Sequence, residues 1–236
     1  MDENNLYVSE IIEKEFSQYK LFELLKEDDF YNIEKTDVII KKNTPFPLSQ
    51  NNVEYIYYIY DGIVAVSVGD EILEFKGPSE FVGLSYDALD GSSQGFTAKS
   101  ITKAKLCRFV KSEVIAKTMS TQEGYLYHYK SMLDQYGLFT HKFTTIKKTR
   151  KEQVYISLQE LAEKFGCPDD RNSNSLKIPT DFSRKILANY IGIGVSKLSE
   201  ILSELQRDFL ITIDNKRQIS VVSNHEGNKL KSPEWE

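Results

Sequence analysis

The segment Ile186–Ile213, with the sequence ILANYIGIGVSKLSEILSELQRDFLITI, constrains the fold of this chain more than any other. Apolar residues recur at helical spacing on both sides of Gly192 and Gly194, and a short apolar strand follows. Two helices joined by a glycine-marked turn are typical of a helix-turn-helix, which presents one helix to a DNA groove. An ordinary helical hairpin packed into a core has the same spacing, so this pattern alone leaves both interpretations open.

The details of this segment predict its packing. Gly192 and Gly194 suit a tight turn with unusual backbone angles, in which Ile193 serves as a buried plug. Leu210–Ile213 and Gln218–Val222 predict two short strands around a polar turn, and thus a hairpin wing. The apolar face expected for the second helix consists of Val195, Leu198, Ile201, Leu202 and Leu205.

The charge of the chain is unevenly distributed. Residues 1–140 contain 14 Lys and Arg against 22 Asp and Glu, a balance of −8, whereas residues 141–236 contain 16 against 13, a balance of +3. The net charge of −5 does not by itself indicate a nucleic-acid partner. The positive excess nevertheless accompanies the predicted helix-turn-helix, where contacts to phosphate would require it.

The N-terminal half has a different character. After an amphipathic opening at Leu6–Leu25, short apolar segments alternate with glycine turns, which is typical of a sandwich or a double-sheet jelly roll. The expected strands are Val38–Lys41, Tyr55–Tyr60, Ile63–Val68, Glu71–Phe75, Phe81–Leu84, Phe96–Ser100 and Ala104–Val110.

A long helix is predicted between the two halves. Ser120 and Glu123 have the spacing of a capping box that would begin this helix. Steps of four and three residues then give a heptad seam, which could pack on the chain's own barrel or on a second subunit; we favour the second subunit. The seam consists of Ile115, Met119, Gln122, Leu126, Tyr129, Leu133, Tyr136, Thr140 and Phe143. A further helix at Glu152–Lys164 and a polar loop at Asp169–Ser175 are expected after it.

Several kinds of site are not supported by the composition. Two cysteines 60 positions apart, Cys107 and Cys167, form neither a metal-ligand spacing nor a disulfide framework, and Cys107 is expected to be a buried apolar residue. The histidines, His128, His141 and His225, lie outside the predicted barrel, so a cupin-type metal enzyme is not expected. No signal peptide or membrane span is apparent, and we expect a cytoplasmic protein that is not an enzyme.

The order of barrel, long helix and winged helix-turn-helix resembles the Crp/Fnr family of transcription regulators. Within that family, the general character of the sequence is most similar to the Listeria virulence-regulator branch. The resemblance rests on Tyr57–Gly83, Phe96–Val114 and Ile186–Ile211 and covers most of residues 20–222. It implies an α+β fold: a cyclic-nucleotide-binding-like jelly-roll β-barrel at 1–117, a dimerisation helix at 118–148, and a winged helix-turn-helix at 149–236. The dimer-interface residues expected are Met119, Leu126, Tyr129, Leu133 and Tyr136.

The resemblance does not identify an effector. Members that bind cyclic nucleotides use an Arg on a barrel loop, but Leu84–Ala98 contains no Arg or Lys and does contain Asp87 and Asp90, so no cAMP binding is expected. Residues 1–106 contain no Cys for an iron–sulfur cluster, and His128 is expected to be an exposed residue rather than a haem ligand. A different small-molecule effector stays open.

The resemblance implies a homodimer that binds a pseudo-palindromic site in double-stranded DNA and contacts RNA polymerase. Many members carry Arg where this chain has Val195 or Glu200, so an A·T-leaning or weaker site is expected. The DNA-contacting residues predicted are Arg184, Lys185, Gly194, Val195, Ser196, Lys197, Ser199 and Glu200. The alternative is a ligand- or protein-binding module of the same fold without sequence-specific DNA binding.

Overall fold

The computed structural model describes all residues except 1–8, 28–30, 85–94, 170–171, 216 and 223–236. The chain forms two compact units, which divide between Thr144 and Thr145. The long helix, predicted as a segment of its own at 118–148, therefore belongs almost entirely to the first unit. Within the described residues, no helix has both the length and the apolar character needed to cross a membrane.

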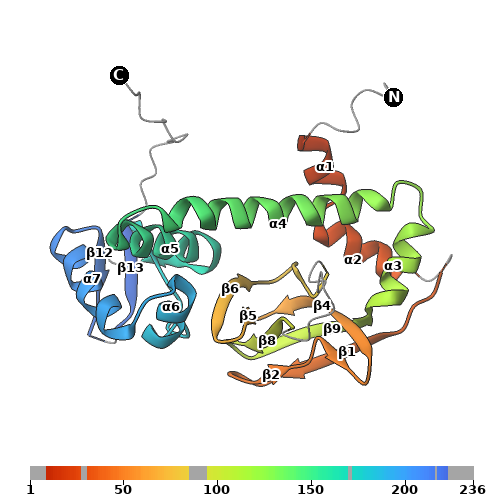
Figure 1. Ribbon diagram of the computed structural model, residues 1–236, viewed down its shortest axis with the longest axis horizontal. Coiled ribbons are helices and arrows are strands. Elements are labelled where there is room, and N and C mark those ends of the chain that lie inside the picture. Colours follow the sequence, from red (N-terminus) through yellow and green to blue (C-terminus); the bar gives the residue numbers. More distant parts are fainter. Residues whose placement is uncertain (1–8, 28–30, 85–94, 170–171, 216, 223–236) are drawn as a thin grey trace. The chain divides into compact units, whose positions relative to one another are not determined.

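Two antiparallel sheets form the barrel of the first unit (Figure 1). These sheets, together with the helices described below, confirm the predicted double-sheet barrel and the α+β class. The first sheet has the order β1 (Lys35–Ile40), β9 (Ala104–Val110), β4 (Val53–Asp61) and β3 (Ser49–Gln50), with β7 (Phe81–Val82) paired to β4. The second has the order β2 (Pro45–Phe46), β8 (Thr97–Ser100), β5 (Val64–Val68) and β6 (Glu71–Lys76).

Strand β4 is buried on both of its faces. Tyr57 and Ile59 point into the core between the two sheets, whereas Ile56 and Tyr58 join a second core on the outer side of the strand. In that second core the ring of Phe22 stacks on Tyr58 with 3.7 Å between ring centroids and 2° between planes. Because side chains alternate along a strand, β4 connects the two cores directly.

Helices α1 (Ser9–Glu15) and α2 (Gln18–Lys26) account for the described part of the amphipathic opening; Leu6 lies outside the described residues. The opening divides at Ser17, whose Oγ accepts a hydrogen bond from the Lys20 N–H at 3.3 Å and caps α2. Leu21, Phe22 and Leu25 bury the apolar face of α2 in the second core of β4.

The predicted capping box at Ser120 is wrong. Helix α3 (Lys111–Met119) ends at Ser120, whose hydroxyl donates to the Lys117 carbonyl at 2.7 Å instead of capping the next helix. Glu123 has a left-handed φ of 61°, and Gly124 is packed so tightly that a Cβ there would lie 1.8 Å from the Thr118 oxygen. Helix α4 (Tyr125–Ile146) therefore begins four residues later than an N-cap at Ser120 would give.

This shift changes which side chains can form the seam. Leu126 is only 1% exposed and packs inside the first unit, so it is not available to a second subunit in this structure. Met119 is exposed but lies at the end of α3, on a different helix from the rest. The large apolar side chains that α4 exposes are Tyr125, Tyr129, Met132, Leu133, Tyr136, Phe139, Phe143 and Ile146.

The second unit combines three helices with one sheet. The helices are α5 (Arg150–Phe165), α6 (Arg184–Ile191) and α7 (Val195–Arg207), and α5 begins with a capping box of Thr149 and Glu152. The sheet has the order β10 (Cys167–Asp169), β11 (Asn172–Lys177), β13 (Ile219–Val222) and β12 (Ile211–Ile213).

The predicted polar loop at Asp169–Ser175 is wrong, because most of it forms strands β10 and β11. Strand β11, NSNSLK, has few apolar residues, and its partner strand β13 lies more than 40 residues away in the sequence. Inside this sheet Asp169 is buried, accepts a hydrogen bond from Ser220 at 2.8 Å and pairs with Lys177 at 3.1 Å. Polar pairing across strands therefore replaces the apolar alternation on which the sequence prediction relied.

The two cysteines differ in environment. Cys107 is buried in β9, as expected, whereas Cys167 is exposed at the start of β10. Burial raises the pKa of the Cys107 thiol to about 11. The reactive thiolate is consequently a minor species at Cys107 near neutral pH.

We expect iodoacetamide at pH 8 to alkylate Cys167 in the folded protein and to spare Cys107, because only about one Cys107 side chain in a thousand is ionised there. Peptide mass spectrometry after a short labelling pulse checks this. Unfolded protein should be labelled at both positions, and folded Cys167→Ser should take up almost no label. Labelling of Cys107 at the rate of Cys167 would contradict the buried environment.

Candidate nucleic-acid interface

Helices α6 and α7 form the predicted helix-turn-helix. Ser183 begins α6 by accepting a hydrogen bond from the Ile186 N–H at 3.3 Å. At the other end Gly192 has a left-handed φ of 75°, and its N–H donates to the Ala188 carbonyl at 2.9 Å, which ends the helix. The sequence thus predicted the role of Gly192 correctly.

The rest of the turn differs from the prediction. Gly194 is the N-cap of α7 with an ordinary φ of −69°, so only one of the two glycines uses unusual backbone angles. Ile193 is half-buried rather than a fully buried plug. The turn is held instead by two backbone donors, Gly192 and Ile193, which share the Ala188 carbonyl at 2.9 and 3.0 Å.

The apolar stripe of α7 fixes this helix in the second unit. Four of its five predicted apolar positions, Leu198, Ile201, Leu202 and Leu205, are 2% exposed or less. They belong to a core that also includes Leu158 of α5 and Leu187 of α6. The fifth position, Val195, is 44% exposed and belongs to the outer face. Burial on one side thus leaves the opposite face of α7 fixed in position and accessible.

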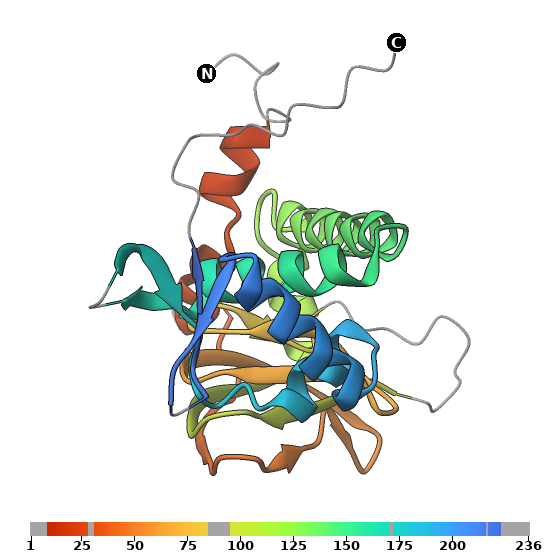
Figure 2. The same ribbon diagram turned by 90° about the vertical axis from the view of Figure 1, so that its left-hand side faces the viewer.

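The predicted contact residues gather at two neighbouring helix ends of the second unit, which Figure 2 shows facing the viewer. Arg184 and Lys185 occupy the first turn of α6 and are exposed. Gly194 caps α7, and its first two turns carry the remaining five predicted residues, all exposed except the half-buried Ser199. Those five residues are Val195, Ser196, Lys197, Ser199 and Glu200.

Two polar contacts organise this surface. The Arg184 guanidinium donates to Ser199 Oγ at 2.9 Å, and the same hydroxyl donates to the Val195 carbonyl at 3.0 Å, so Ser199 links α6 to α7. Lys197 Nζ pairs with Glu200 Oε2 at 2.9 Å. This ion pair is exposed and joins residues about one helical turn apart. It therefore offsets the charge of Lys197 but contributes little to stability.

The hairpin wing adds Arg217, which was not among the predicted contact residues. Strands β12 and β13 pair as predicted, and their turn is closed by Gln218 and Arg217 N–H groups that donate to Asp214, both at 2.9 Å. Arg217 has a left-handed φ of 63° and is exposed. A cation in a turn was visible in the sequence, but only the fold brings it near α6.

A groove of about 260 Å³ lies between the wing turn and the segment that leads into α6. Arg184 and Arg217 line it from opposite elements, together with the hydroxyl-bearing side chains of Thr180 and Ser183. Two arginines and two hydroxyl-bearing residues are chemically suited to contact an anionic oxygen. The groove extends the predicted contact surface of α6 toward the wing.

The residues considered for effectors of the barrel fall into two groups. Most of the predicted cAMP loop, including Asp87 and Asp90, lies outside the described residues, as does His225. His128 and His141 are exposed on α4. Among the residues that are described, no three His, Cys, Asp or Glu side chains gather as they would around a metal ion.

Comparison with known proteins gives related regulators. The chain is 22% identical over 200 residues to the transcriptional activator protein Anr of Pseudomonas protegens, a match that covers 78% of this chain and 79% of Anr. It is 22% identical over 190 residues to the nitrogen fixation regulation protein FixK of Azorhizobium caulinodans, covering 78% and 74%. No family model matches the chain.

Solved structures share its architecture. A cyclic nucleotide-binding domain containing protein from Listeria monocytogenes superimposes with a TM-score of 0.64 at 20% identity, over 86% of this chain and 95% of that one. This likeness extends over most of both chains, so the two proteins share a fold.

The backbone of the turn gives a matched pair of variants. Gly192→Ala places a Cβ on a left-handed residue and should lower the free energy of unfolding by about 1–2 kcal/mol. Gly194→Ala meets open space at an ordinary φ and should change it by less than about 0.5 kcal/mol. Urea denaturation followed by circular dichroism measures both. Equal losses would show that the turn does not depend on the left-handed glycine.

Proposed function

Because the chain belongs to the Crp/Fnr family of transcription regulators, we propose that it binds a pseudo-palindromic promoter site in double-stranded DNA as a homodimer. The observation that carries this proposal is the N-terminal half of α7, which is fixed by four buried apolar residues and presents an exposed polar face. A helix held in this way fits the major groove, where base edges can be distinguished.

We assign base reading to the first two turns of α7. The Ser196 hydroxyl can donate to or accept from a base, Glu200 can accept from cytosine N4, and Val195 can contact a thymine methyl group. Ser199 is already engaged with Arg184 and Val195, so we now assign it a positioning role between α6 and α7. Without an arginine to read guanine, the preferred site should lean toward A·T pairs.

We assign phosphate contact to the cations around this face. Lys197 projects from the first turn of α7, and Arg184 and Lys185 from the start of α6. Arg217 joins them because it lines the same groove as Arg184. Phosphate contacts fix the position of a protein on DNA without reading its sequence.

The exposed stripe of α4 supports a homodimer. Seven of its apolar residues follow one another at steps of four and three, which is a heptad repeat, and aromatic side chains predominate in it. Such a stripe fits the same stripe of a second subunit, and two-fold symmetry provides two copies of α7 for two half-sites. The repeat consists of Tyr125, Tyr129, Met132, Tyr136, Phe139, Phe143 and Ile146.

We further propose that the dimer acts in the cytoplasm and, on the family resemblance, that it contacts RNA polymerase. Because Leu84–Ala98 contains no Arg or Lys, an effector of the barrel would not be a cyclic nucleotide. A barrel-containing binding module that does not recognise specific DNA is the alternative, and the experiment below separates the two.

The dimer should retard a palindromic fragment from its own upstream region in a mobility-shift assay, with an affinity that falls steeply as salt rises. Lys197→Ala should weaken binding to all sequences and lower the slope of log K against log salt by about 1. Ser196→Ala and Glu200→Ala should instead change the preferred base pair. Salt-independent or undetectable binding would favour the alternative module.

The separate assignment of base reading and phosphate contact has a control of its own. Glu200→Ala also releases Lys197 from its ion pair, so it should tighten binding to unrelated DNA while it lowers discrimination. Equal losses from all three variants on every sequence would refute the assignment of base reading and phosphate contact.

A charge in the α4 stripe should dissociate the dimer. Tyr136→Asp buries an unpaired carboxylate in the proposed interface, so sedimentation should shift to the monomer and DNA binding should be lost. His141→Asp, an exposed position on the opposite side of the same helix, is the matched control and should remain dimeric. An unchanged sedimentation profile for Tyr136→Asp would contradict this interface.

A further inference from the structure

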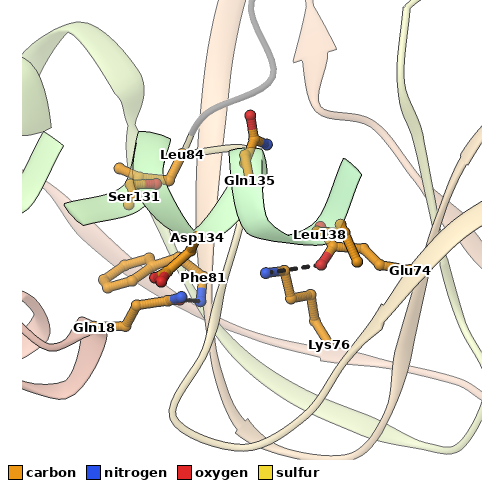
Figure 3. A pocket seen from close by; sticks show the side chains of 9 residues that line it. All are labelled: Gln18, Glu74, Lys76, Phe81, Leu84, Ser131, Asp134, Gln135 and Leu138. Carbon is orange, nitrogen blue, oxygen red and sulfur yellow. Dashed lines mark hydrogen bonds and ion pairs between the residues drawn. The ribbon is translucent and has the colours of Figure 1, made fainter. Parts of the chain in front are cut away.

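A small polar cavity of about 40 Å³ lies in the first unit, between β6, β7 and α4 (Figure 3). Glu74 and Lys76 reach it from β6, Phe81 from β7, and Asp134 and Gln135 from α4. A space of this size accommodates a few non-hydrogen atoms. The cavity therefore lies between a sheet of the barrel and α4, the helix that carries the exposed apolar stripe.

Glu74 has an unusual environment in this cavity. Its side chain is 90% buried, and Oε2 pairs with Lys76 Nζ at 3.0 Å. Its other oxygen, Oε1, is buried without a hydrogen-bond partner, the one such side-chain atom within the part of the chain that the structure describes. A buried carboxylate oxygen without a donor is costly, so such an atom in a native fold calls for a partner.

The charges around the cavity select the kind of partner. Glu74 and Asp134 supply two carboxylates, whereas Lys76 is the single cation among the lining residues. Asp134 is exposed and is also paired with Lys130, one helical turn earlier on α4. Lys76 is also shared, since Glu80 Oε1 lies 3.8 Å from its Nζ. Burial alone would lower the pKa of Lys76, but the carboxylates of Glu74, Glu80 and Asp134 outweigh this effect and raise it. The ammonium group is thus retained, and the three carboxylates outnumber the ammonium groups of Lys76 and Lys130 by one.

We propose that this cavity binds the ammonium group of a small amine, which donates a hydrogen bond to Glu74 Oε1 and is further attracted by Asp134. An ammonium group provides three donors and a positive charge, which match an acceptor oxygen in an acidic site. Lys76 and Lys130 are each already paired with a carboxylate, so an anionic ligand would face a small net negative charge and is disfavoured here.

The site would also connect binding to regulation, a consequence that rests on the proposed function. Asp134 and Gln135 belong to α4, whose other face carries the apolar stripe. An amine bound between β6 and α4 would stabilise the position of α4 against the barrel. By thermodynamic linkage, an amine that binds the DNA-competent form more tightly raises DNA affinity by the same factor.

Ethylammonium chloride tests the site in the full-length protein. Isothermal titration calorimetry should show saturable binding of ethylammonium, and thermal unfolding should shift upward with it. Ethanol and sodium acetate, the neutral and anionic analogues, should give neither effect at matched ionic strength. Ammonium chloride distinguishes an inorganic cation from an alkylamine as the preferred ligand.

Variants locate the binding. Glu74→Gln should weaken ethylammonium binding roughly tenfold or more because it removes the charged acceptor. Asp134→Asn provides a second variant in case Glu74→Gln does not fold. Glu71→Gln, an exposed position on the same strand, should bind like the wild type. Binding that persists unchanged in both cavity variants, or an equal response to ethanol, would overturn the proposal.

The two proposals can fail separately. Calorimetry does not involve DNA, so amine binding by a protein that does not shift DNA would support the cavity and contradict the regulator. DNA binding without any saturable response to ethylammonium or ammonium would overturn the amine site and leave the regulator standing.

Discussion

The burial of β4 on both faces is the constraint on which the first unit depends. Tyr57 and Ile59 close the core between the sheets, while Ile56 and Tyr58 hold α2 against the outer side. The stacked pair of Phe22 and Tyr58 joins that helix to the strand. Because one strand contributes to both cores, the barrel, the N-terminal helices and the beginning of α4 are parts of one packed structure, with Leu126 buried in it.

Helix α4 has two faces with different chemistry. Toward the barrel it supplies Asp134 and Gln135 to a small acidic cavity, and on its exposed side it presents a heptad repeat of mostly aromatic residues. A polar contact on one face and an apolar stripe on the other suit a helix that joins ligand binding to subunit association. The carboxylate of Glu74, which has one oxygen without a hydrogen-bond partner, is the feature that favours a positively charged ligand in this cavity.

In the second unit, too, the two faces of one helix have different roles: one face of α7 stabilises the fold and the other is available for recognition. Buried leucines and isoleucines fix α7, so its polar face is left for contact with DNA. Within that face the Arg184–Ser199 bond holds the starts of the two helices together, and the Lys197–Glu200 pair reduces the free positive charge. Ser196 and Glu200 are the residues proposed to contact bases, and the charge of Lys197 is partly neutralised. Such a surface suits recognition that depends on groove shape and backbone contacts as well as on bases.

The sequence by itself determined what depends on local periodicity: most barrel strands, α5 to α7, the wing, the left-handed Gly192 and the cluster of predicted contact residues at the start of α7. Tertiary structure decided what depends on partners distant in the sequence. Ser120 ends a helix at a turn where Gly124 packs closely against Thr118, β11 is a strand because β13 pairs with it, and Leu126 is buried inside the first unit. Likewise, no sequence pattern places Glu74 beside Asp134, 60 residues away, because cavities are formed by packing, which local spacing does not encode.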